Sequence, residues 1–175
     1  SMVTGRNGSG KSTIGLALEI LQSVARGSNQ LSKLVDRKNF SRGRDDVPMR
    51  FEICVDIDES NYEYVLALEL QKESKELGVF EEKLNVNGDP LYCRQREKVN
   101  LNQNENSLAD FSVSTKLVAL AILQGNKDDT HLTKFKKWLS RMLILRPIPS
   151  LITGESKEMT LEPNAAVTNF GAWFS

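Results

Sequence analysis

Two spacings of apolar residues divide the chain into a helical start, a long extended middle and a second helical region. From residue 11 to about 26, apolar residues recur at the i, i+3, i+4 and i+7 positions of one helix face, and Gly27-Ser28-Asn29 follows as a stop signal. A second stripe of this kind runs over 130–145 and ends just before Pro147. These spacings predict amphipathic helices at 11–26 and 130–145.

Between the two helices the apolar residues recur at every second position. Four segments share this alternation: 50–57, 62–70, 79–86 and 91–99. Asp58-Glu59-Ser60-Asn61 supplies turn residues between the first two, and Asn87-Gly88, the strongest short hairpin signal, joins the last two. The pattern predicts an antiparallel β meander over 50–101, with one buried face and one solvated face.

The segment after the meander contains a continuous apolar run. Residues 102–107 are polar and predict a loop, whereas 117–123 are all apolar and short enough for a fully buried strand. Residues 151–175 carry few periodic signals, and we expect an irregular tail. The predicted fold is therefore an α/β lobe over residues 1–150 with an antiparallel meander as a subdomain.

Composition narrows the class of protein. The 175 residues correspond to one domain or slightly more, at about 150 residues per domain. Twenty-three Lys and Arg balance twenty-three Asp and Glu, which argues against a polybasic nucleic-acid binder. No apolar run reaches the length of about 18 residues that a membrane span needs. Cys54 and Cys93 lack ligand spacing, so we expect reduced thiols in a cytoplasmic protein.

The strongest motif is a phosphate-binding loop at the start of the chain. It matches G-x-x-x-x-G-K-[ST] and consists of Gly5, Arg6, Asn7, Gly8, Ser9, Gly10, Lys11 and Ser12, with Thr13 following. Glycines allow backbone N–H groups to converge on phosphate oxygens, and the N-terminus of the next helix adds its dipole. Lys11 would contact the β- and γ-phosphates, and the Ser12 hydroxyl would be a Mg²⁺ ligand. Thr13 could bond the α-phosphate.

A phosphate loop normally follows a buried parallel strand, and here only Met2-Val3-Thr4 could supply one. Ser1-Met2 resembles a cloning scar. We therefore expect that the preceding strand is very short or has been cut away, and we favour truncation.

The loop sequence Asn7-Gly8-Ser9-Gly10-Lys11-Ser12-Thr13 resembles that of ABC-type ATPases, and more specifically of the SMC/RecF-like, AAA-annotated branch. The order of helix, meander, strand and helix is similar to the N-terminal lobe of that branch over about Met2–Ile148. The resemblance implies ATP and Mg²⁺ as cofactors and ATP hydrolysis coupled to dimerisation of the heads. It also implies a role in DNA maintenance or defence.

The same resemblance implies a glutamine after a strand that contacts Mg²⁺ and the attacking water. Gln124 occupies that place in the order, so Gln124 joins Lys11 as a candidate catalytic residue and Ser12 as a candidate metal ligand. Arg42 and Arg44, beyond the first helix, are weaker candidates for a nucleotide contact.

The chain departs from the family pattern in two places. It has no L-S-G-G-Q-like signature, and no run of four apolar residues followed by Asp-Glu. The nearest segment, Ile53–Glu59, alternates and predicts a solvated hairpin. In this branch those parts come from a C-terminal lobe, through which a homodimer would form. We expect this chain to bind nucleotide better than it hydrolyses it, because hydrolysis also needs a polarised water.

Other readings of the sequence remain open. Asn126-Lys127-Asp128-Asp129 matches the guanine-reading N-K-x-D of GTPases, although the required D-x-x-G is missing, and Asp128, Asp129 or Thr130 could instead cap a helix. A small-molecule kinase is a further alternative. A non-enzymatic, nucleotide-gated module that contacts DNA would use the basic segments Arg37–Arg44 and Lys134–Arg141. We expect His131 at a helix surface, and Phe170, Trp173 and Phe174 as core or interface anchors.

Overall fold

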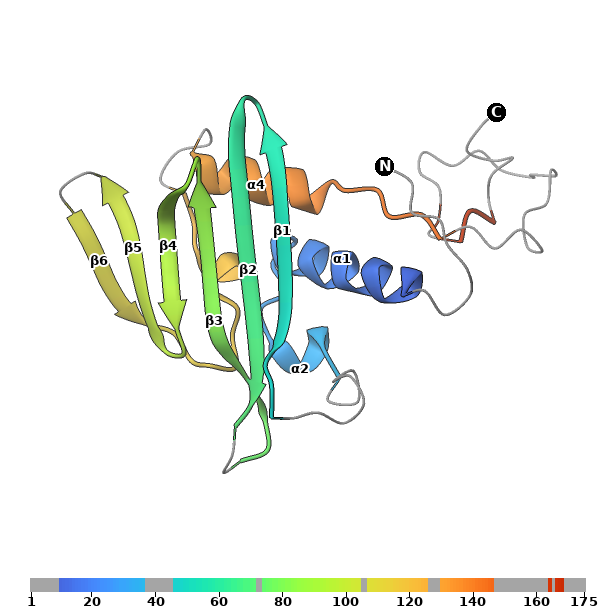
Figure 1. The fold of residues 1–175 in the computed structure, drawn as a ribbon, viewed down its shortest axis with the longest axis horizontal. Helices are drawn as coiled ribbons and strands as arrows, with labels where there is room; N and C mark the ends of the chain where they lie inside the picture. The colour runs from blue at the N-terminus through green and yellow to red at the C-terminus, as the bar shows by residue number, and fades with distance from the viewer. Residues whose placement is uncertain are drawn as a thin grey trace. The chain divides into compact units, whose positions relative to one another are not determined.

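The computed structural model describes residues 10–36, 46–71, 74–104, 107–125, 130–146, 164 and 166–168 (Figure 1). The helices and strands follow in this order: α1 (Lys11–Ala25), α2 (Leu31–Leu34), β1 (Met49–Ile57), β2 (Ser60–Leu70), β3 (Leu77–Val86), β4 (Asp89–Gln95), β5 (Lys98–Asn104), β6 (Ser107–Ser112), α3 (Ala119–Ile122) and α4 (His131–Ser140). The chain is of the α/β class.

The strands form one six-stranded sheet in the order β1-β2-β3-β4-β5-β6, and every neighbouring pair is antiparallel (Figure 1). The predicted antiparallel meander is confirmed. The predicted turns are confirmed as well. Asp58 and Glu59 have φ of 46° and 64°, and Asn87 and Gly88 have φ of 53° and 89°. Positive φ at both central residues defines the turn type whose twist matches that of a two-stranded hairpin.

The meander is longer than the sequence pattern predicted. The predicted strand 91–99 is in fact two strands, because a turn at Arg96-Glu97 separates β4 from β5 and Arg96 has a φ of 52°. The loop predicted at 102–107 is also wrong in part, since β5 continues to Asn104 and β6 begins at Ser107. These strands were not predicted because their sequence is rich in asparagine, a residue that is depleted in strands.

The chain divides into two compact units, one of residues 20–141 and one of residues 1–19 with 142–175. In the 20–141 unit, α2 and α4 contact the sheet through β3 and β1, and the end of α1 is buried at Ile20, Leu21 and Val24. Phe135 of α4 stacks on Tyr62 of β2 with ring centroids 5.7 Å apart. Each fully buried large side chain of this core contributes on the order of 1.5–3 kcal/mol.

The buried strand predicted at 117–123 is wrong. Leu117 forms an isolated antiparallel bridge with Gln30, and the next residues form the short helix α3. Periodicity alone cannot tell a short buried strand from a buried helical turn. Ala and Leu at 119–121 are strong helix formers, and a carboxylate described below accepts the first two amides of α3.

The two predicted long helices are present with shorter ends. Helix 11–26 is confirmed as α1, and helix 130–145 ends at Ser140. Arg141 is the C-cap of α4, and the guanidinium of Arg26 donates to the Ser140 carbonyl at 2.9 Å. That bond satisfies a terminal carbonyl from outside the helix. Helix α2 was not predicted, because four residues are too few for a periodic signal.

In the other unit, α1 carries Glu19, whose carboxylate pairs with the guanidinium of Arg146. Gly15 lies close to the same side chain, since a Cβ at Gly15 would be 3.1 Å from the Arg146 Cδ. A glycine therefore lets Arg146 lie along α1. Within the described part of the chain, no helix combines the length and apolar character that crossing a membrane requires.

Candidate functional site

The last residues of the phosphate-binding motif form the start of α1. Gly10 has a φ of 86°, and its carbonyl accepts the amide of Ile14 at 3.1 Å, which begins the helix. A Cβ at Gly10 would meet nothing within 4 Å, so the dihedral angle rather than space requires glycine here. The motif residues Gly5, Arg6, Asn7, Gly8 and Ser9 lie outside the described residues.

The first turn of α1 suits an anion. It contains Lys11, Ser12 and Thr13 and no acidic residue, and Ser12 and Thr13 are exposed. α1 has 15 residues, so its aligned peptide dipoles leave partial positive charge at this end. The donor set fits a nucleotide phosphate with Mg²⁺, since the ion would take the Ser12 hydroxyl as an oxygen ligand and phosphate oxygens as others. In the described ranges, no three His, Cys, Asp or Glu side chains are grouped so that they could hold a metal ion.

Gln124 follows α3 instead of ending a strand, and its side chain is exposed. It belongs to the 20–141 unit, whereas Lys11 and Ser12 belong to the other unit. The residues on either side of Gln124 contact α4 and its cap. The Leu123 carbonyl accepts the Lys136 ammonium at 2.9 Å, and a Cβ at Gly125 would be 2.2 Å from the Thr130 hydroxyl oxygen. Gln124 is thus an exposed side chain on a fixed backbone.

The start of α4 is capped by Thr130. Its hydroxyl accepts the amide of Thr133 at 3.2 Å, which satisfies one of the unpaired N–H groups of the first turn. This capping was predicted among the alternatives. The N-K-x-D tetrapeptide Asn126–Asp129 lies outside the described residues, as do Arg37, Lys38, Arg42 and Arg44. His131 is exposed, as expected, and its Nδ1 forms a 2.8 Å hydrogen bond with the Tyr62 hydroxyl.

Glu82 on β3 and Arg94 on β4 form a buried charged pair that was not predicted from the sequence. Both side chains have zero exposure, and their register pairs them directly across the two strands. The Glu82 carboxylate accepts the hydroxyls of Tyr64 and Tyr92 at 3.1 and 2.9 Å. It also accepts the amides of Ala119 and Leu120 at 2.8 and 2.7 Å. Glu82 therefore caps α3.

Arg94 binds the segment just before α3. Its guanidinium donates to the carbonyls of Val113, Ser114 and Leu117 at 3.2, 2.9 and 2.7 Å. Its Nε donates to the Arg96 carbonyl in the next turn. The bond from Arg94 to the Glu82 carboxylate is longer, at 3.4 Å. In the described part of the chain, no buried side-chain polar atom is left without a partner.

Burial shifts the pKa values of the titratable side chains in this network. Burial, and then the negative charge of Glu82, raises the pKa of Tyr64 and Tyr92 well above the ordinary value of 10.0. Burial lowers the pKa of the Arg94 guanidinium, against the opposing effect of Glu82. Burial also lowers the pKa of Lys136. At neutral pH both tyrosines are therefore neutral donors to a carboxylate.

A signal for this pair was present in the sequence. Glu82 lies two and four residues before Leu84 and Val86, and Arg94 lies two residues after Tyr92. Both therefore occupy positions of the apolar face in a pattern of period two. Charged residues are almost never fully buried unless they are paired, so two of them in this phase indicate a buried pair.

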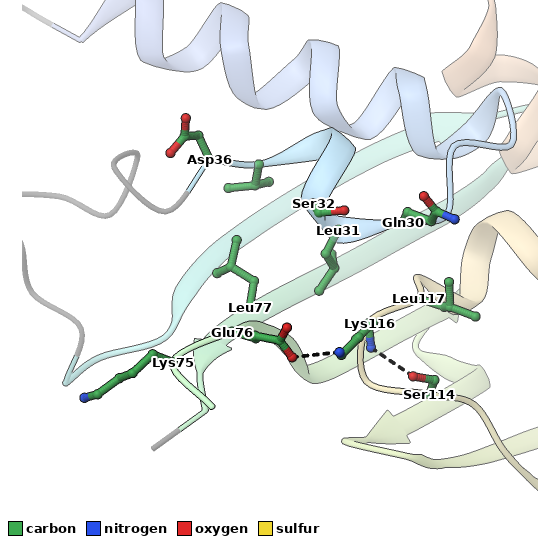
Figure 2. Close-up of a pocket in the computed structure, with 11 residues that line it drawn as sticks. Gln30, Leu31, Ser32, Asp36, Lys75, Glu76, Leu77, Ser114, Lys116 and Leu117 are labelled. Carbon is green, nitrogen blue, oxygen red and sulfur yellow. Dashed lines mark hydrogen bonds and ion pairs between the residues drawn. The ribbon is translucent and has the colours of Figure 1, made fainter. Parts of the chain in front are cut away.

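A pocket and two exposed cysteines were also considered as sites, and neither contains a predicted site residue. A pocket of about 680 Å³ lies between α2, the β2–β3 connection and the 114–117 turn (Figure 2). Leu31, Val35 and Leu77 are among its lining residues, and an exposed ion pair between Lys116 and Glu76, 2.7 Å apart, lies beside them. Cys54 and Cys93 are exposed free thiols on separate strands. None of the predicted site residues lines this pocket.

The comparisons with known proteins identify a family. Residues 1–130 match the family described as "AAA domain, putative AbiEii toxin, Type IV TA system". No curated protein and no solved structure matches the chain. The match spans both the phosphate-binding motif and the six-stranded sheet, and it supports an ATPase-like nucleotide-binding module with ATP and Mg²⁺ as the general cofactors of such proteins. The chain therefore belongs to this AAA domain family and carries the N-terminal, AAA-type P-loop ATPase-like region.

Proposed function

We propose that this chain binds ATP through Gly5–Thr13 and forms the N-terminal lobe of an SMC/RecF-like ATPase with a P-loop fold. One observation carries the proposal. Gly10 of the motif has a positive φ, and Lys11, Ser12 and Thr13 occupy the first turn of a 15-residue helix, a turn that contains no acidic residue. That combination is the anion site that a nucleotide phosphate needs.

In this proposal each residue has a separate task. The backbone N–H groups of the loop and the Lys11 ammonium hold the phosphates, and the Ser12 hydroxyl orients the metal-bound phosphate end. Mg²⁺ supplies charge neutralisation on the β- and γ-phosphates. Gln124 would offer its carboxamide oxygen as a second metal ligand and orient the attacking water.

Turnover in this proposal requires a dimer of heads, with the acidic residue and signature segment supplied by a C-terminal lobe. The proposed setting is DNA maintenance or defence in the cytoplasm. Two exposed free thiols, Cys54 and Cys93, agree with a reducing compartment.

The test is nucleotide binding by calorimetry. Lys11→Ala should abolish ATP binding, whereas Lys33→Ala, at an exposed position of α2, should leave it unchanged. Equal ATP affinity in the Lys11→Ala variant would contradict the site assignment. Competition between ATP and GTP tests the GTPase alternative, since a preference for GTP would favour reading by Asn126–Asp129.

A DNA-contacting module without its own catalysis is the second candidate. The observation in its favour is that α4 and its cap carry Lys134, Lys136, Lys137 and Arg141 and no acidic residue. Lys136 donates to the Leu123 carbonyl, so Lys137 and Arg141 are the exposed cations on which this candidate would mainly depend. Binding of duplex DNA that weakens with added salt would support it, and no binding at low salt would contradict it.

A further inference from the structure

Arg146 lies against the helix that follows the phosphate-binding motif. Its guanidinium pairs with the Glu19 carboxylate, and its Cδ is 3.1 Å from the position that a Cβ at Gly15 would take. Gly15 is buried, so a larger residue there would displace the Arg146 side chain. All three residues belong to the same compact unit as the phosphate-binding motif. The position of Arg146 on α1 is therefore defined within one unit.

The Arg146 guanidinium lies about one helical turn from the first turn of α1. Gly15 follows Lys11 by four residues, so both lie on one face of the helix. At 1.5 Å per residue, Ser12 is about 4.5 Å from Gly15 along the axis toward the phosphate end, and Glu19 is about 6 Å in the other direction. Helix side chains lean toward the N-terminus, so the Glu19 carboxylate lies back over the turn of Gly15. Rotation of the Arg146 side chain would therefore carry its guanidinium from Glu19 to the first turn.

The ion pair that holds Arg146 in its present position is easily exchanged. The Arg146 and Glu19 side chains are 44% and 31% exposed, and exposed ion pairs contribute little because water screens both charges. A nucleotide triphosphate carries several negative charges, and a guanidinium can donate two parallel N–H groups to phosphate oxygens. The single carboxylate of Glu19 is therefore a weaker partner for Arg146 than a bound triphosphate.

We propose that Arg146 is a further phosphate-binding residue, which pairs with Glu19 in the free protein and turns to the γ-phosphate when ATP binds. Arg146 lies on the face of α1 that carries Lys11, and the Lys11 ammonium contacts the β- and γ-phosphates in the proposed site. ADP lacks the γ-phosphate, so Arg146 favours ATP over ADP. This inference rests on the proposed function, because it adds a residue to the nucleotide site proposed there.

Arg146→Gln tests the contact, because glutamine keeps a polar side chain and removes the charge. In calorimetry, the Kd for ATP should rise about tenfold, as the loss of a hydrogen bond between charged groups predicts, and the Kd for ADP should stay the same. A structural role for Arg146 predicts equal losses for both nucleotides, which would overturn the inference. Arg96→Gln is the matched control, since Arg96 forms an exposed ion pair with Glu69 in the other unit and should change neither Kd.

Glu19→Gln tests the exchange of partners, because it removes the competing carboxylate. The affinity for ATP should rise about two- to fivefold, which corresponds to the release of an exposed ion pair. In the Arg146→Gln background, Glu19→Gln should leave ATP affinity unchanged, because no competition remains. A loss of ATP affinity in Glu19→Gln alone would show that the pair only fastens Arg146 to α1, and the inference would be overturned. Thermal unfolding of each variant establishes that it is folded at the assay temperature.

The outcomes separate this inference from the proposed function. If Lys11→Ala leaves ATP binding intact, the proposed function fails and the role of Arg146 fails with it. If Lys11→Ala abolishes binding and Arg146→Gln leaves the ratio of the ADP and ATP dissociation constants unchanged, nucleotide binding stands and the role of Arg146 is overturned. A fall in that ratio with Arg146→Gln, together with a rise with Glu19→Gln, supports both.

Discussion

The carboxylate of Glu82 and the guanidinium of Arg94 face each other in the core, yet their mutual bond is the longest that either carboxylate or guanidinium makes. It measures 3.4 Å, whereas Glu82 accepts the amide of Leu120 at 2.7 Å and Arg94 donates to the carbonyl of Leu117 at 2.7 Å. The two charges neutralise one another, but their directed bonds go to the backbone of residues 113–120. The pair therefore acts as two anchors on one segment.

This geometry predicts an unusual response to substitution. Glu82→Leu alone should lower the free energy of unfolding by about 3–5 kcal/mol, because it leaves Arg94 buried without a counter-charge. Replacing both residues, by Leu and Met, restores stability in many buried pairs. Here the double variant should remain destabilised, because backbone groups at 113, 114, 117, 119 and 120 lose their partners at about 1–3 kcal/mol each.

Urea unfolding of the two single variants and the double variant checks this prediction. A double variant as stable as the wild type would contradict the conclusion that Glu82 and Arg94 anchor the backbone of residues 113–120. Arg96→Met is a suitable control, since Arg96 forms an exposed ion pair with Glu69 and exposed pairs are worth about 0–1 kcal/mol.

The buried tyrosines predict a loss of stability at alkaline pH. The folded pKa values of Tyr64 and Tyr92 are raised well above 10.0, so between pH about 10 and the folded pKa the native state binds more protons than the unfolded state. Stability contributed by these hydroxyls is therefore complete below pH 10 and falls as the pH rises through that range. The variant with Tyr64→Phe and Tyr92→Phe should lose this slope.

The lowered pKa of Lys136 acts in the opposite sense near its ordinary value of 10.5, so the difference between wild type and the double Phe variant is the quantity to compare. Equal slopes of unfolding free energy against pH in both proteins would rule out the tyrosines as the source.

The close packing around Gly125 predicts that any other residue there lowers stability. Gly125→Ala places a Cβ 2.2 Å from the Thr130 Oγ1, which caps α4, so either the cap or the 123–125 backbone must move. We expect a loss of about 1–3 kcal/mol, as for other overpacked sites. Gly88→Ala is a useful comparison by thermal unfolding, because there the positive φ of 89° causes the strain and no atom lies within 4 Å of the new Cβ. Adding Thr130→Ala to the Gly125→Ala variant should not restore stability, because Thr130→Ala removes the cap of α4.

The cap itself supports a smaller prediction. Thr130→Ala should lower the free energy of unfolding by about 1 kcal/mol, because the Thr133 amide loses its acceptor, and Thr130→Ser should retain most of the stability. Chemical denaturation of the three proteins measures both values. A Ser variant as unstable as the Ala variant would show that the methyl group, not the hydroxyl, matters.

Ser12 gives a prediction at the nucleotide site. Ser12→Ala should weaken binding of ATP with Mg²⁺ about tenfold and leave binding of ATP in EDTA nearly unchanged, because the hydroxyl is the proposed metal ligand. Thr13→Ala is the comparison at the next position of α1, and it should affect both conditions equally. Equal effects of Ser12→Ala in the two conditions would remove Ser12 from the metal site.

The sequence predicted the elements whose signals are local. The turns at Asp58-Glu59 and Asn87-Gly88 have the positive φ values that their residues favour, and α1 carries its apolar stripe over many residues. The antiparallel order of the strands followed from those turns. The phosphate-binding motif also needs no tertiary information, since its residues are consecutive.

The errors came from contacts between distant residues. Nothing near 117–123 shows that Glu82, 37 and 38 residues earlier, accepts the amides of Ala119 and Leu120 and so stabilises a helical turn where a strand was predicted. The end of α4 depends on Arg26, which lies 114 residues away from Ser140. The role assigned to Gln124 rested on a strand that is not there, since Gln124 follows the short helix α3.

A β bulge at Phe80 determines which of two adjacent glutamates, Glu81 or Glu82, faces the core. β3 pairs Val79 with Leu68 and Glu81 with Ala67, so Phe80 is an extra residue in the ladder, and its carbonyl accepts the amide of Arg96. If the same sequence paired without the bulge, strict alternation from Val79 would turn Glu82 to the solvated face and bring Glu81 inside. The bulge therefore decides which of the two adjacent glutamates enters the core, and deleting Phe80, which removes the bulge and leaves Val79 and Glu82 two positions apart, should keep Glu82 inside.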